Sequence, residues 1–295
     1  VLFRGQLPVC YVVCADLDVN CLTIVTVDED QQAQVWEIHS ARSLARIDGV
    51  NAETCRFSDD GQTVAMIGPE GFVALWQPFV RAPVNPPGHA CEVWSVAFSP
   101  DGRWLASGSD DHTVRIWKTL DGSELRTLQG HTATVTGVAF SPDGHTLASG
   151  SLDGLVKLWQ VNGGQEIRTL QGHEKRVCCL TFSPDGSLLA SGGDKAIVWD
   201  VRTFQEATAF RAHESQRINA VRFSPDGSVL AVASNSGHVL LVASRDWQVF
   251  RTLEHDDEVW AVDFSPDGRT LATGDKSGNL RVWSIAAGQP LAVRR

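Results

Sequence analysis

The 295-residue sequence lacks several features that would assign it to a membrane-spanning, secreted or nucleic-acid-binding class. It has no run of the roughly 18 apolar residues that a membrane helix needs, and its first ten residues, VLFRGQLPVC, lack the charged-then-apolar pattern of a signal peptide. Basic residues number only 25 against 35 acidic ones, which gives a formal charge of -10. A general binder of the phosphate backbone needs a basic face. We therefore expect neither a membrane nor a nucleic-acid partner.

Cysteine pairs and common catalytic motifs are also missing. The seven cysteines are odd in number and form no C-x-x-C pair, so the sequence indicates neither a disulfide framework nor a zinc knuckle. No G-x-x-x-x-G-K-[ST] loop, G-x-S-x-G elbow or H-E-x-x-H helix occurs. The acidic stretches VDED (27–30) and HDDE (255–258) match no defined calcium loop. We expect a reduced, cytoplasmic location and no catalytic residue, cofactor or metal.

One pattern recurs along the whole chain. FSPDG, or FSDDG in its first copy, begins at Phe57, Phe98, Phe140, Phe182, Phe223 and Phe264, at spacings of 41, 42, 42, 41 and 41 residues. Nineteen residues after the phenylalanine stands Trp76, Trp117, Trp159, Val242 or Trp283, whereas Trp199 follows Phe182 at seventeen; Leu17 and Trp36 mark a degenerate first unit. We predict one domain, residues 1–295, with approximate repeats 1–48, 49–88, 89–130, 131–172, 173–212, 213–254 and 255–295.

Each repeat reads as four short β-strands. In the repeat 131–172, VTGVAF is rich in β-formers, SPDG is a turn, HTLASGS is a second strand, and LVKLW and EIRTLQG follow as a third and a fourth. No segment shows sustained helical periodicity. Because four short strands cannot bury both faces of a sheet, neighbouring repeats must stack. Radial stacking protects sheet edges that an open array would expose.

The repeat resembles the WD40, or β-transducin, family. The resemblance is carried by Gly130-His131, VAFSPDG, LASGS, Asp153 and the terminal Trp159, and the naming dipeptide survives as Trp199-Asp200. It covers nearly the whole chain and weakens in the first repeat, with Pro8 in the histidine register, and in the sixth, with Val242 in place of tryptophan. It implies an all-β fold, a seven-bladed β-propeller in which each blade is a four-stranded antiparallel sheet.

The resemblance also implies a role for the recurring histidine, serine, aspartate and tryptophan. In the family these four side chains form a buried hydrogen-bonded tetrad. The matching sets are His89, Ser107, Asp111 and Trp117; His131, Ser149, Asp153 and Trp159; and His173, Ser191, Asp194 and Trp199. A partial set has His255, Thr273 and Trp283, with Ser277 in the aspartate register. A catalytic triad would occur once, beside a cleft, so recurrence favours a structural role.

Two tryptophans outside the repeat register are candidate binding residues. Trp94 and Trp260 both stand four residues before the phenylalanine, where other repeats have Thr136, Cys178 and Asn219. Trp94 shares strand parity with Val96 and Phe98, so both tryptophans could extend the core. In the family, however, this position faces the top surface around the central channel, where partner peptides dock. Exposed tryptophans on a rigid platform are typical interface anchors.

Charged residues accompany the tryptophans on this predicted rim. By the same carry-over the rim is acidic near repeats two, three and seven and basic near repeats five and six. The predicted partner-binding residues are Glu92, Trp94, Asp110, Thr136, Arg176, Arg217, Asn219, Glu258 and Trp260. Such a rim would suit a protein or peptide partner with basic and apolar features, and its charge would act on specificity and association rate.

Either terminus could supply the last strand of the seventh blade. The N-terminal LFRGQ resembles the fourth-strand TLQGH, and GQPLAVRR (288–295) fits the same strand, because Gly288 lies five residues after Trp283 as Gly122 does after Trp117. Both cannot occupy one place. We favour the N-terminal strand.

The sequence therefore predicts a non-enzymatic scaffold or adaptor for protein–protein interaction, with a role in signalling. By analogy with bacterial chains of this kind, it is a propeller domain of a larger regulatory protein. We expect a monomer, since a closed array leaves no free sheet edge. The alternatives are a propeller enzyme, or a small-molecule or peptide sensor, using carboxylates of the top face or channel.

Overall fold

A computed structural model describes residues 12–17, 23–28, 30, 32–37, 42–47, 52, 54–58, 60–68, 71–77, 88–210, 217–288 and 290–294. Within these residues the chain forms 27 β-strands in seven antiparallel sheets and contains no α-helix. The predicted all-β fold of seven propeller blades is confirmed. The chain divides into two compact units, residues 1–140 with 161–164 and residues 141–160 with 165–295.

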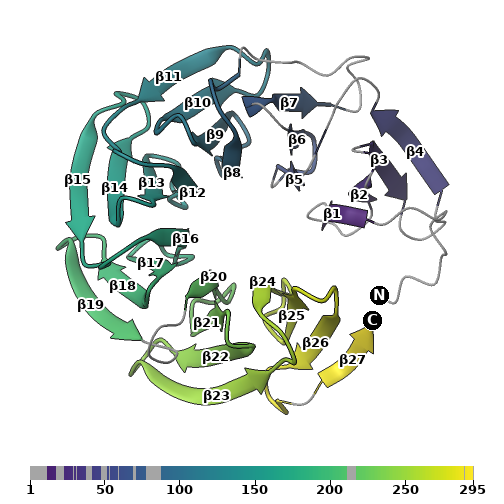
Figure 1. The fold of residues 1–295 in the computed structure, drawn as a ribbon, viewed down its shortest axis with the longest axis vertical. Coiled ribbons are helices and arrows are strands. Elements are labelled where there is room, and N and C mark those ends of the chain that lie inside the picture. The colour runs from purple at the N-terminus through teal and green to yellow at the C-terminus, as the bar shows by residue number, and fades with distance from the viewer. Residues whose placement is uncertain are drawn as a thin grey trace. The chain divides into compact units, whose positions relative to one another are not determined.

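The first unit contains the first three sheets and the first strand of the fourth repeat (Figure 1). Its strands are β1 (Val12–Leu17), β2 (Thr23–Asp28), β3 (Ala33–Glu37) and β4 (Arg42–Ile47); β5 (Thr54–Phe57), β6 (Val64–Ile67) and β7 (Val73–Trp76); β8 (Val93–Phe98), β9 (Trp104–Ser109), β10 (Val114–Lys118) and β11 (Glu124–Leu128); and β12 (Val135–Phe140). Consecutive strands pair within each sheet. Among neighbouring sheets, β1 packs against β5, β5 against β8 and β8 against β12.

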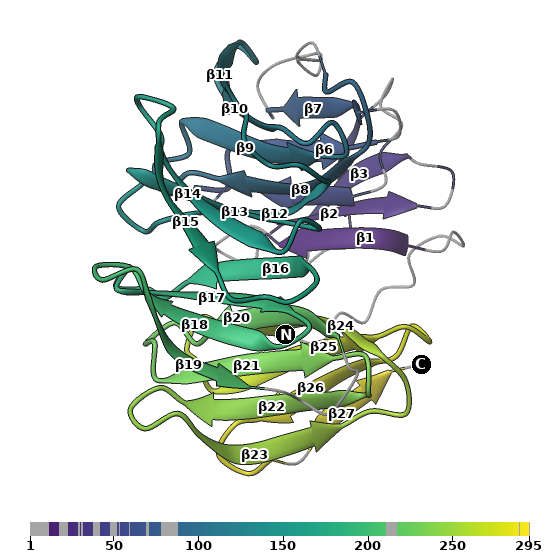
Figure 2. The same ribbon diagram turned by 60° about the vertical axis from the view of Figure 1, so that its left-hand side comes forward.

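The second unit contains the rest of the fourth repeat and the last three sheets. Its strands are β13 (Thr146–Ser151), β14 (Leu155–Gln160) and β15 (Glu166–Gln171); β16 (Val177–Phe182), β17 (Leu188–Gly193), β18 (Ala196–Asp200) and β19 (Gln205–Phe210); β20 (Ile218–Phe223), β21 (Val229–Ser234), β22 (His238–Ala243) and β23 (Gln248–Glu254); and β24 (Val259–Phe264), β25 (Thr270–Asp275), β26 (Leu280–Ser284) and β27 (Pro290–Arg294). The first strand of each sheet packs on the next, β16 on β20 and β20 on β24 (Figures 1 and 2).

The glycine of the LASGS stretch shows how closely neighbouring sheets approach. A Cβ placed on Gly192 of β17 would lie 2.6 Å from Cγ2 of Ile218, the first residue of β20 in the next repeat. Gly108 receives Val135 in the same way in the first unit, and Gly150 receives Val177 in the second, at 2.7 and 2.5 Å. Such distances leave no room for a side chain, so this glycine lets a β-branched residue of the next sheet pack against the backbone.

The SPDG stretch is a turn held by its serine and aspartate. Ser141 Oγ donates to Asp143 Oδ1 at 2.5 Å, and the amides of His145 and Thr146 donate to Asp143 Oδ1 and Ser141 Oγ at 2.9 and 3.0 Å. Gly144 has a φ of 70°, which glycine adopts without strain. The same serine–aspartate bond recurs at Ser58, Ser99, Ser183, Ser224 and Ser265. The sequence predicts the turn but not these bonds, which also lower the pKa of Asp143.

The last strand of the chain contradicts the prediction that an N-terminal strand completes the seventh sheet. The C-terminal strand β27 pairs with β26, with Arg281 opposite Val293 and Trp283 opposite Pro290, and is the fourth strand of the seventh sheet. The preference for an N-terminal strand in this place is therefore wrong. The turn is set locally, because Gly288 has a φ of 65° and its amide donates to Ser284 O at 2.7 Å, as that of Gly122 donates to Lys118 O. Residues 1–11 lie outside the described residues.

The second sheet has three strands within the described residues, so its predicted fourth strand stays a prediction. There it consists of β5, β6 and β7, and residues 78–87, where a fourth strand would fall, lie outside the described part of the chain.

Removing the carboxylate of one SPDG turn should weaken the fold measurably. We expect Asp143→Ala to lower the free energy of unfolding by about 1–2 kcal/mol, because one hydroxyl and one amide lose their acceptor. Asp143→Asn keeps an acceptor oxygen at this place and should lose less. Urea denaturation of the three proteins measures the difference, and equal stability of the alanine variant and the wild type would contradict the assigned role.

Candidate functional site

The third repeat brings its predicted tetrad together inside the first unit. His89 Nδ1 lies 2.8 Å from Asp111 Oδ2, His89 Nε2 lies 2.6 Å from Ser107 Oγ, and Trp117 Nε1 donates to Ser107 Oγ at 2.8 Å. The indole has no acceptor nitrogen, so the serine hydroxyl accepts from it and donates to Nε2, which leaves Nδ1 to donate to the carboxylate. Ser107 and Trp117 are fully buried.

The fifth repeat makes the same connections in the second unit. His173 lies 2.8 Å from Ser191 Oγ and 3.3 Å from Asp194 Oδ1, and Trp199 Nε1 donates to Ser191 Oγ at 2.8 Å. The other carboxylate oxygen of Asp194 is buried without a hydrogen-bond partner within the described residues. In the third repeat Thr113 binds Oδ1 of the aspartate through its amide and hydroxyl. The turn after Asp194 is shorter and continues with lysine and alanine, so it offers no such hydroxyl.

The tetrad predicted for the fourth repeat falls on both units. In the second unit, Trp159 Nε1 donates to Ser149 Oγ at 2.8 Å, and Asp153 accepts from the amide of Leu155 at 2.9 Å. His131 belongs to the first unit, where it is buried.

The seventh repeat completes its tetrad with a residue that the sequence analysis did not choose. His255 lies 2.7 Å from Thr273 Oγ1, which also accepts from Trp283 Nε1 at 2.7 Å, and His255 Nδ1 lies 3.2 Å from Asp275 Oδ2. Ser277 stands in the aspartate register, but it donates to Asp257 at 2.6 Å and does not replace the missing carboxylate. An aspartate two residues earlier, at the end of β25, reaches the same imidazole nitrogen.

Within its described residues, the first repeat shows the tryptophan–hydroxyl bond of the tetrad. Trp36 Nε1 donates to Thr26 Oγ1 at 2.9 Å. This threonine was not among the predicted tetrad residues, although it stands ten residues before the tryptophan, as Ser107 and Ser149 do in their repeats.

The geometry of the complete tetrads is unsuited to nucleophilic attack. Ser107 and Ser191 are fully buried, and a tryptophan N–H occupies each hydroxyl. Burial lowers the pKa of His89, His173 and His255 below the ordinary 6.5. Burial acts to raise the pKa of Asp111, but bonds from Thr113 and His89 outweigh it and hold that pKa at about 2. These histidines are thus neutral, and the carboxylate of Asp111 is ionised, near pH 7.

A β-bulge turns Trp94 out of its sheet. The pairing of β8 with β9 shifts register between Val93 and Ser95, so Trp94 is the extra residue. Its side chain is 57% exposed, and its indole N–H donates to Asp110 Oδ1 at 3.0 Å. Thr134 Oγ1 donates to the same oxygen at 2.6 Å. Glu92, two residues before Trp94, is exposed.

Trp260 has the same setting in the second unit. The pairing of β24 with β25 shifts between Val259 and Ala261, and Trp260 is 55% exposed. Its indole N–H donates to Glu258 Oε2 at 3.1 Å, while Lys276 Nζ donates to Glu258 Oε1 at 3.2 Å. These contacts, the tryptophan bond first, lower the pKa of Glu258. The carboxylates thus hold each ring by its edge and leave much of it exposed.

The bulge is the signal that sequence analysis lacked. Simple alternation gives Trp94 the parity of Val96 and Phe98, whereas one extra residue reverses the face on which the side chain lies. Register shifts at the same place make Cys178 and Asn219 the extra residues of β16 and β20. We call the end of each sheet where its first strand begins the bulge end.

The remaining predicted rim residues differ in exposure. Arg176 is exposed, and Thr136, Arg217 and Asn219 are half-buried. Arg217 Nε donates to Asn219 Oδ1 at 2.7 Å, and Asn219 Nδ2 donates to the carbonyl of Val259 at 2.9 Å.

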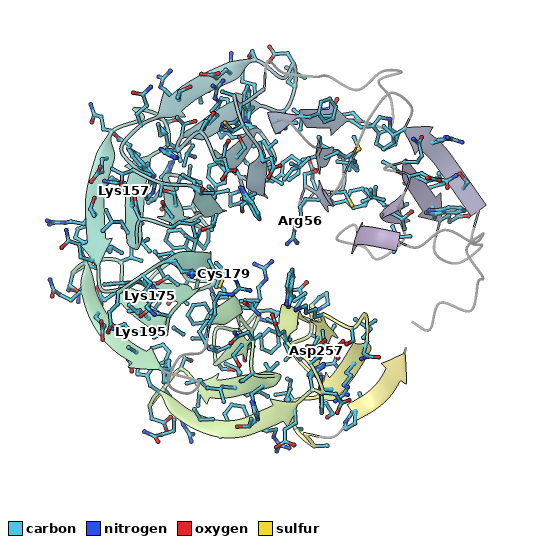
Figure 3. All side chains as sticks on the ribbon, viewed as in Figure 1. Arg56, Lys157, Lys175, Cys179, Lys195 and Asp257 are labelled. Carbon is cyan, nitrogen blue, oxygen red and sulfur yellow. The ribbon has the colours of Figure 1, made fainter. Side chains whose placement is uncertain are left out.

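Lys157, labelled in Figure 3, bonds Glu166 at 2.8 Å, between the third and fourth strands of its repeat.

The described residues include neither a candidate membrane span nor a candidate metal site. In the part of the chain that the structure describes, no helix has the length and apolar character needed to cross a bilayer. No cluster of three or more histidine, cysteine, aspartate or glutamate side chains among the same residues could hold a metal ion.

The sheets, turns and tetrads define a WD40-repeat β-propeller protein. The family model that matches residues 92–294, well over half of the chain, is described as the IFT122 first beta-propeller, and the chain belongs to this family.

Curated relatives share shorter stretches. Elongator complex protein 2 of Saccharomyces cerevisiae is 30% identical over 119 residues, 38% of this chain and 12% of that protein. Nuclear distribution protein nudF of Aspergillus niger is 31% identical over 125 residues, 35% of this chain and 28% of that protein. Vegetative incompatibility protein HET-E-1 of Podospora anserina is 58% identical over 36 residues, 12% and 3% of the two chains. The chain thus spans less than a third of these relatives.

Buried and exposed tryptophans of the same sheet should differ sharply in their contribution to stability. We expect Trp117→Ala to lower the free energy of unfolding by about 3–5 kcal/mol, the usual cost of truncating a buried aromatic. Trp94→Ala in the same sheet should cost no more than about 0.5 kcal/mol. Guanidinium denaturation measures both, and an unchanged midpoint for Trp117→Ala would contradict a core role for the tetrad tryptophan.

The tetrad histidines should make stability depend on pH. Because their folded pKa lies below the unfolded value of 6.5, the unfolded chain binds more protons, so stability should be full above about pH 6.5 and decrease towards pH 5. We expect His89→Gln to reduce this slope in urea denaturations at pH 5–8. His145→Gln, at an exposed turn histidine, is the control. An unchanged slope in His89→Gln would refute the assignment.

Proposed function

We propose that the chain is a protein–protein interaction scaffold whose partner docks on the bulge ends of the sheets. The observation that carries the proposal is the pair of exposed, bulged tryptophans, Trp94 in the first unit and Trp260 in the second. Large exposed aromatics on a rigid sheet are typical anchors of protein interfaces, because they bury much area at a small entropic cost. The tetrads act as fasteners of the blades in this proposal and take no part in binding.

The surroundings of each tryptophan favour a partner with basic and apolar features. Asp110 and Glu258 accept the indole N–H groups, so the rings need no hydrogen bond from a partner and offer an apolar face. A lysine or arginine over such a ring gains about 0.5–1 kcal/mol at an exposed site. The carboxylates of Glu92, Asp110 and Glu258 add attraction for the same cation.

The relatives support the general role. Elongator complex protein 2 is named as part of a complex, which agrees with a propeller that serves association. A role in signalling, a cytoplasmic location, a monomeric state and attachment to a larger regulatory protein belong to the same proposal. The odd number of cysteines without C-x-x-C spacing supports a reduced compartment.

Affinity capture tests the proposal directly. Wild-type protein, Trp94→Ala, Trp260→Ala and the double variant serve as baits in a native lysate. We expect the double variant to lose the partners that the wild type captures, and each single variant to retain them in part, because hot-spot anchors carry most of an interface's energy.

The control removes an exposed apolar side chain elsewhere. Leu120 is 82% exposed in the turn between β10 and β11, and Leu120→Ala should capture as the wild type does. All baits should melt at nearly the same temperature. Full recovery of partners by the double variant would remove the bulge ends from consideration.

A further inference from the structure

One asparagine–glycine pair occurs in the sequence, at Asn162-Gly163. It lies in the turn that joins β14 to β15, three residues after Trp159, and both of its residues are exposed. The equivalent place in the third repeat, three residues after Trp117, holds Leu120, whose side chain is 82% exposed. The turn therefore presents the side chain of Asn162 to water.

The side-chain amide of Asn162 makes no hydrogen bond within the described residues. The hydrogen bond of this residue is made by its main-chain oxygen, which accepts from Arg126 Nη2 at 3.1 Å. The N–H of Gly163 also has no acceptor in the described part of the chain. The side chains of the three other described asparagines are each held by a hydrogen bond; they are Asn219, Asn235 and Asn279. Asn162 is thus free to move where the others are fixed.

The aspartate–glycine pairs of the chain are fixed as well. Eight lie within the described residues, and the carboxylate of each accepts a hydrogen bond from its own turn; the aspartates are Asp60, Asp101, Asp121, Asp143, Asp153, Asp185, Asp226 and Asp267. Bonds from Ser141 and from the amide of His145 also keep the pKa of Asp143 below its ordinary value. An ionised carboxylate resists nucleophilic attack, whereas the neutral amide of an asparagine does not.

We propose that Asn162 is a site of spontaneous deamidation, in which the main-chain nitrogen of Gly163 attacks the side chain of Asn162. This nitrogen loses its proton to water and bonds to Cγ of the asparagine, and the side-chain nitrogen leaves as ammonia. Water then opens the cyclic imide. Opening at Cγ gives aspartate, whereas opening at the main-chain carbonyl gives isoaspartate, in which the chain runs through Cγ.

The residue after the asparagine favours this reaction. Glycine has no Cβ to obstruct the approach of its nitrogen to Cγ, and its backbone rotates more freely than that of any other residue. The N–H of Gly163 gives up no hydrogen bond within the described residues when it reacts. The side chain, the nucleophile and the water that completes the reaction therefore meet at an exposed turn.

The products should differ in their effect on the neighbouring strand β11. A Cβ placed on Gly164 would lie 3.2 Å from Cδ of Arg126 and 3.3 Å from Cδ2 of Leu128, so this turn packs closely on β11. Aspartate keeps the main-chain oxygen that accepts from Arg126 and adds a negative charge beside the guanidinium. Isoaspartate lengthens the main chain by one carbon and displaces that oxygen. We expect isoaspartate to weaken the contact and aspartate to preserve it.

Peptide mapping tests the proposal. The full chain is kept for several days at mildly alkaline pH, either folded or unfolded in guanidinium, and the tryptic peptide 158–168 is then analysed by mass spectrometry. We expect Asn162 to deamidate in the folded protein at a rate within about threefold of that in the unfolded chain. Asn219, Asn235 and Asn279 should deamidate only in the unfolded chain. An intact Asn162 in the folded protein, with the same residue deamidated in guanidinium, would overturn the proposal.

Gly163→Ala is the matched variant. Gly164 has a φ of 70°, whereas Gly163 is not in the left-handed region, so alanine should be tolerated there. Its Cβ should slow the deamidation of Asn162 at least about fivefold. An unchanged rate in Gly163→Ala would show that the Gly163 nitrogen is not the nucleophile.

Melting temperatures separate the two products. Fresh Asn162→Asp protein should melt with the fresh wild type, because it carries the aspartate product alone. Aged wild-type protein that contains isoaspartate should melt at a lower temperature, and aged Gly163→Ala protein should not. Equal melting of aged and fresh wild type, with isoaspartate detected in the aged sample, would contradict the expected effect on the contact with β11.

Discussion

The packing of each sheet's first strand against the next sheet is the constraint on which the structure depends. The middle strands are buried on both faces, as in β6 and β7, where every residue is buried, and a lone sheet of this kind would expose both apolar faces to water. In the second unit the cover is supplied by residues such as Ile218 and Val259, which are fully buried. Gly192 makes the approach possible by presenting bare backbone to Ile218.

The turns and tetrads serve this packing by fixing where each first strand begins and ends. The tetrad histidine precedes the first strand and binds the second strand and the following turn, and the tryptophan of the third strand binds the same hydroxyl. The SPDG serine closes the other end of the hairpin. A polar quartet is tolerated among apolar sheets because its members satisfy one another. The same bonds fix the protonation state of the quartet, with a neutral histidine and an ionised aspartate.

Prediction from the sequence succeeded where one residue type determines a local structure, and failed where the local backbone geometry differs from that of the other repeats. The strands, the SPDG turns and the tetrad of the third repeat follow from composition, spacing and family resemblance. Asp275 was missed because register counting assumes a constant turn, whereas this aspartate reaches His255 from the end of the strand. The strand β27 was misjudged because two segments fitted one pattern, and only pairing with β26 distinguishes them. The exposure of Trp94 depends on a bulge, which strict alternation does not contain.

At the bulge, two consecutive residues have different roles: the first packs in the core, and the extra residue does not. The residue before it remains β-branched and buried, as Val177, Ile218 and Val259 are, since it fills the space beside the preceding sheet. The extra residue does not fill this space, because it lies outside the regular ladder. It is a cysteine, an asparagine or a tryptophan in these three sheets. Surface chemistry can therefore change from one sheet to the next without altering the core. A rigid array with independently variable surface positions is suited to recognising a chemically mixed partner, one sheet for each feature.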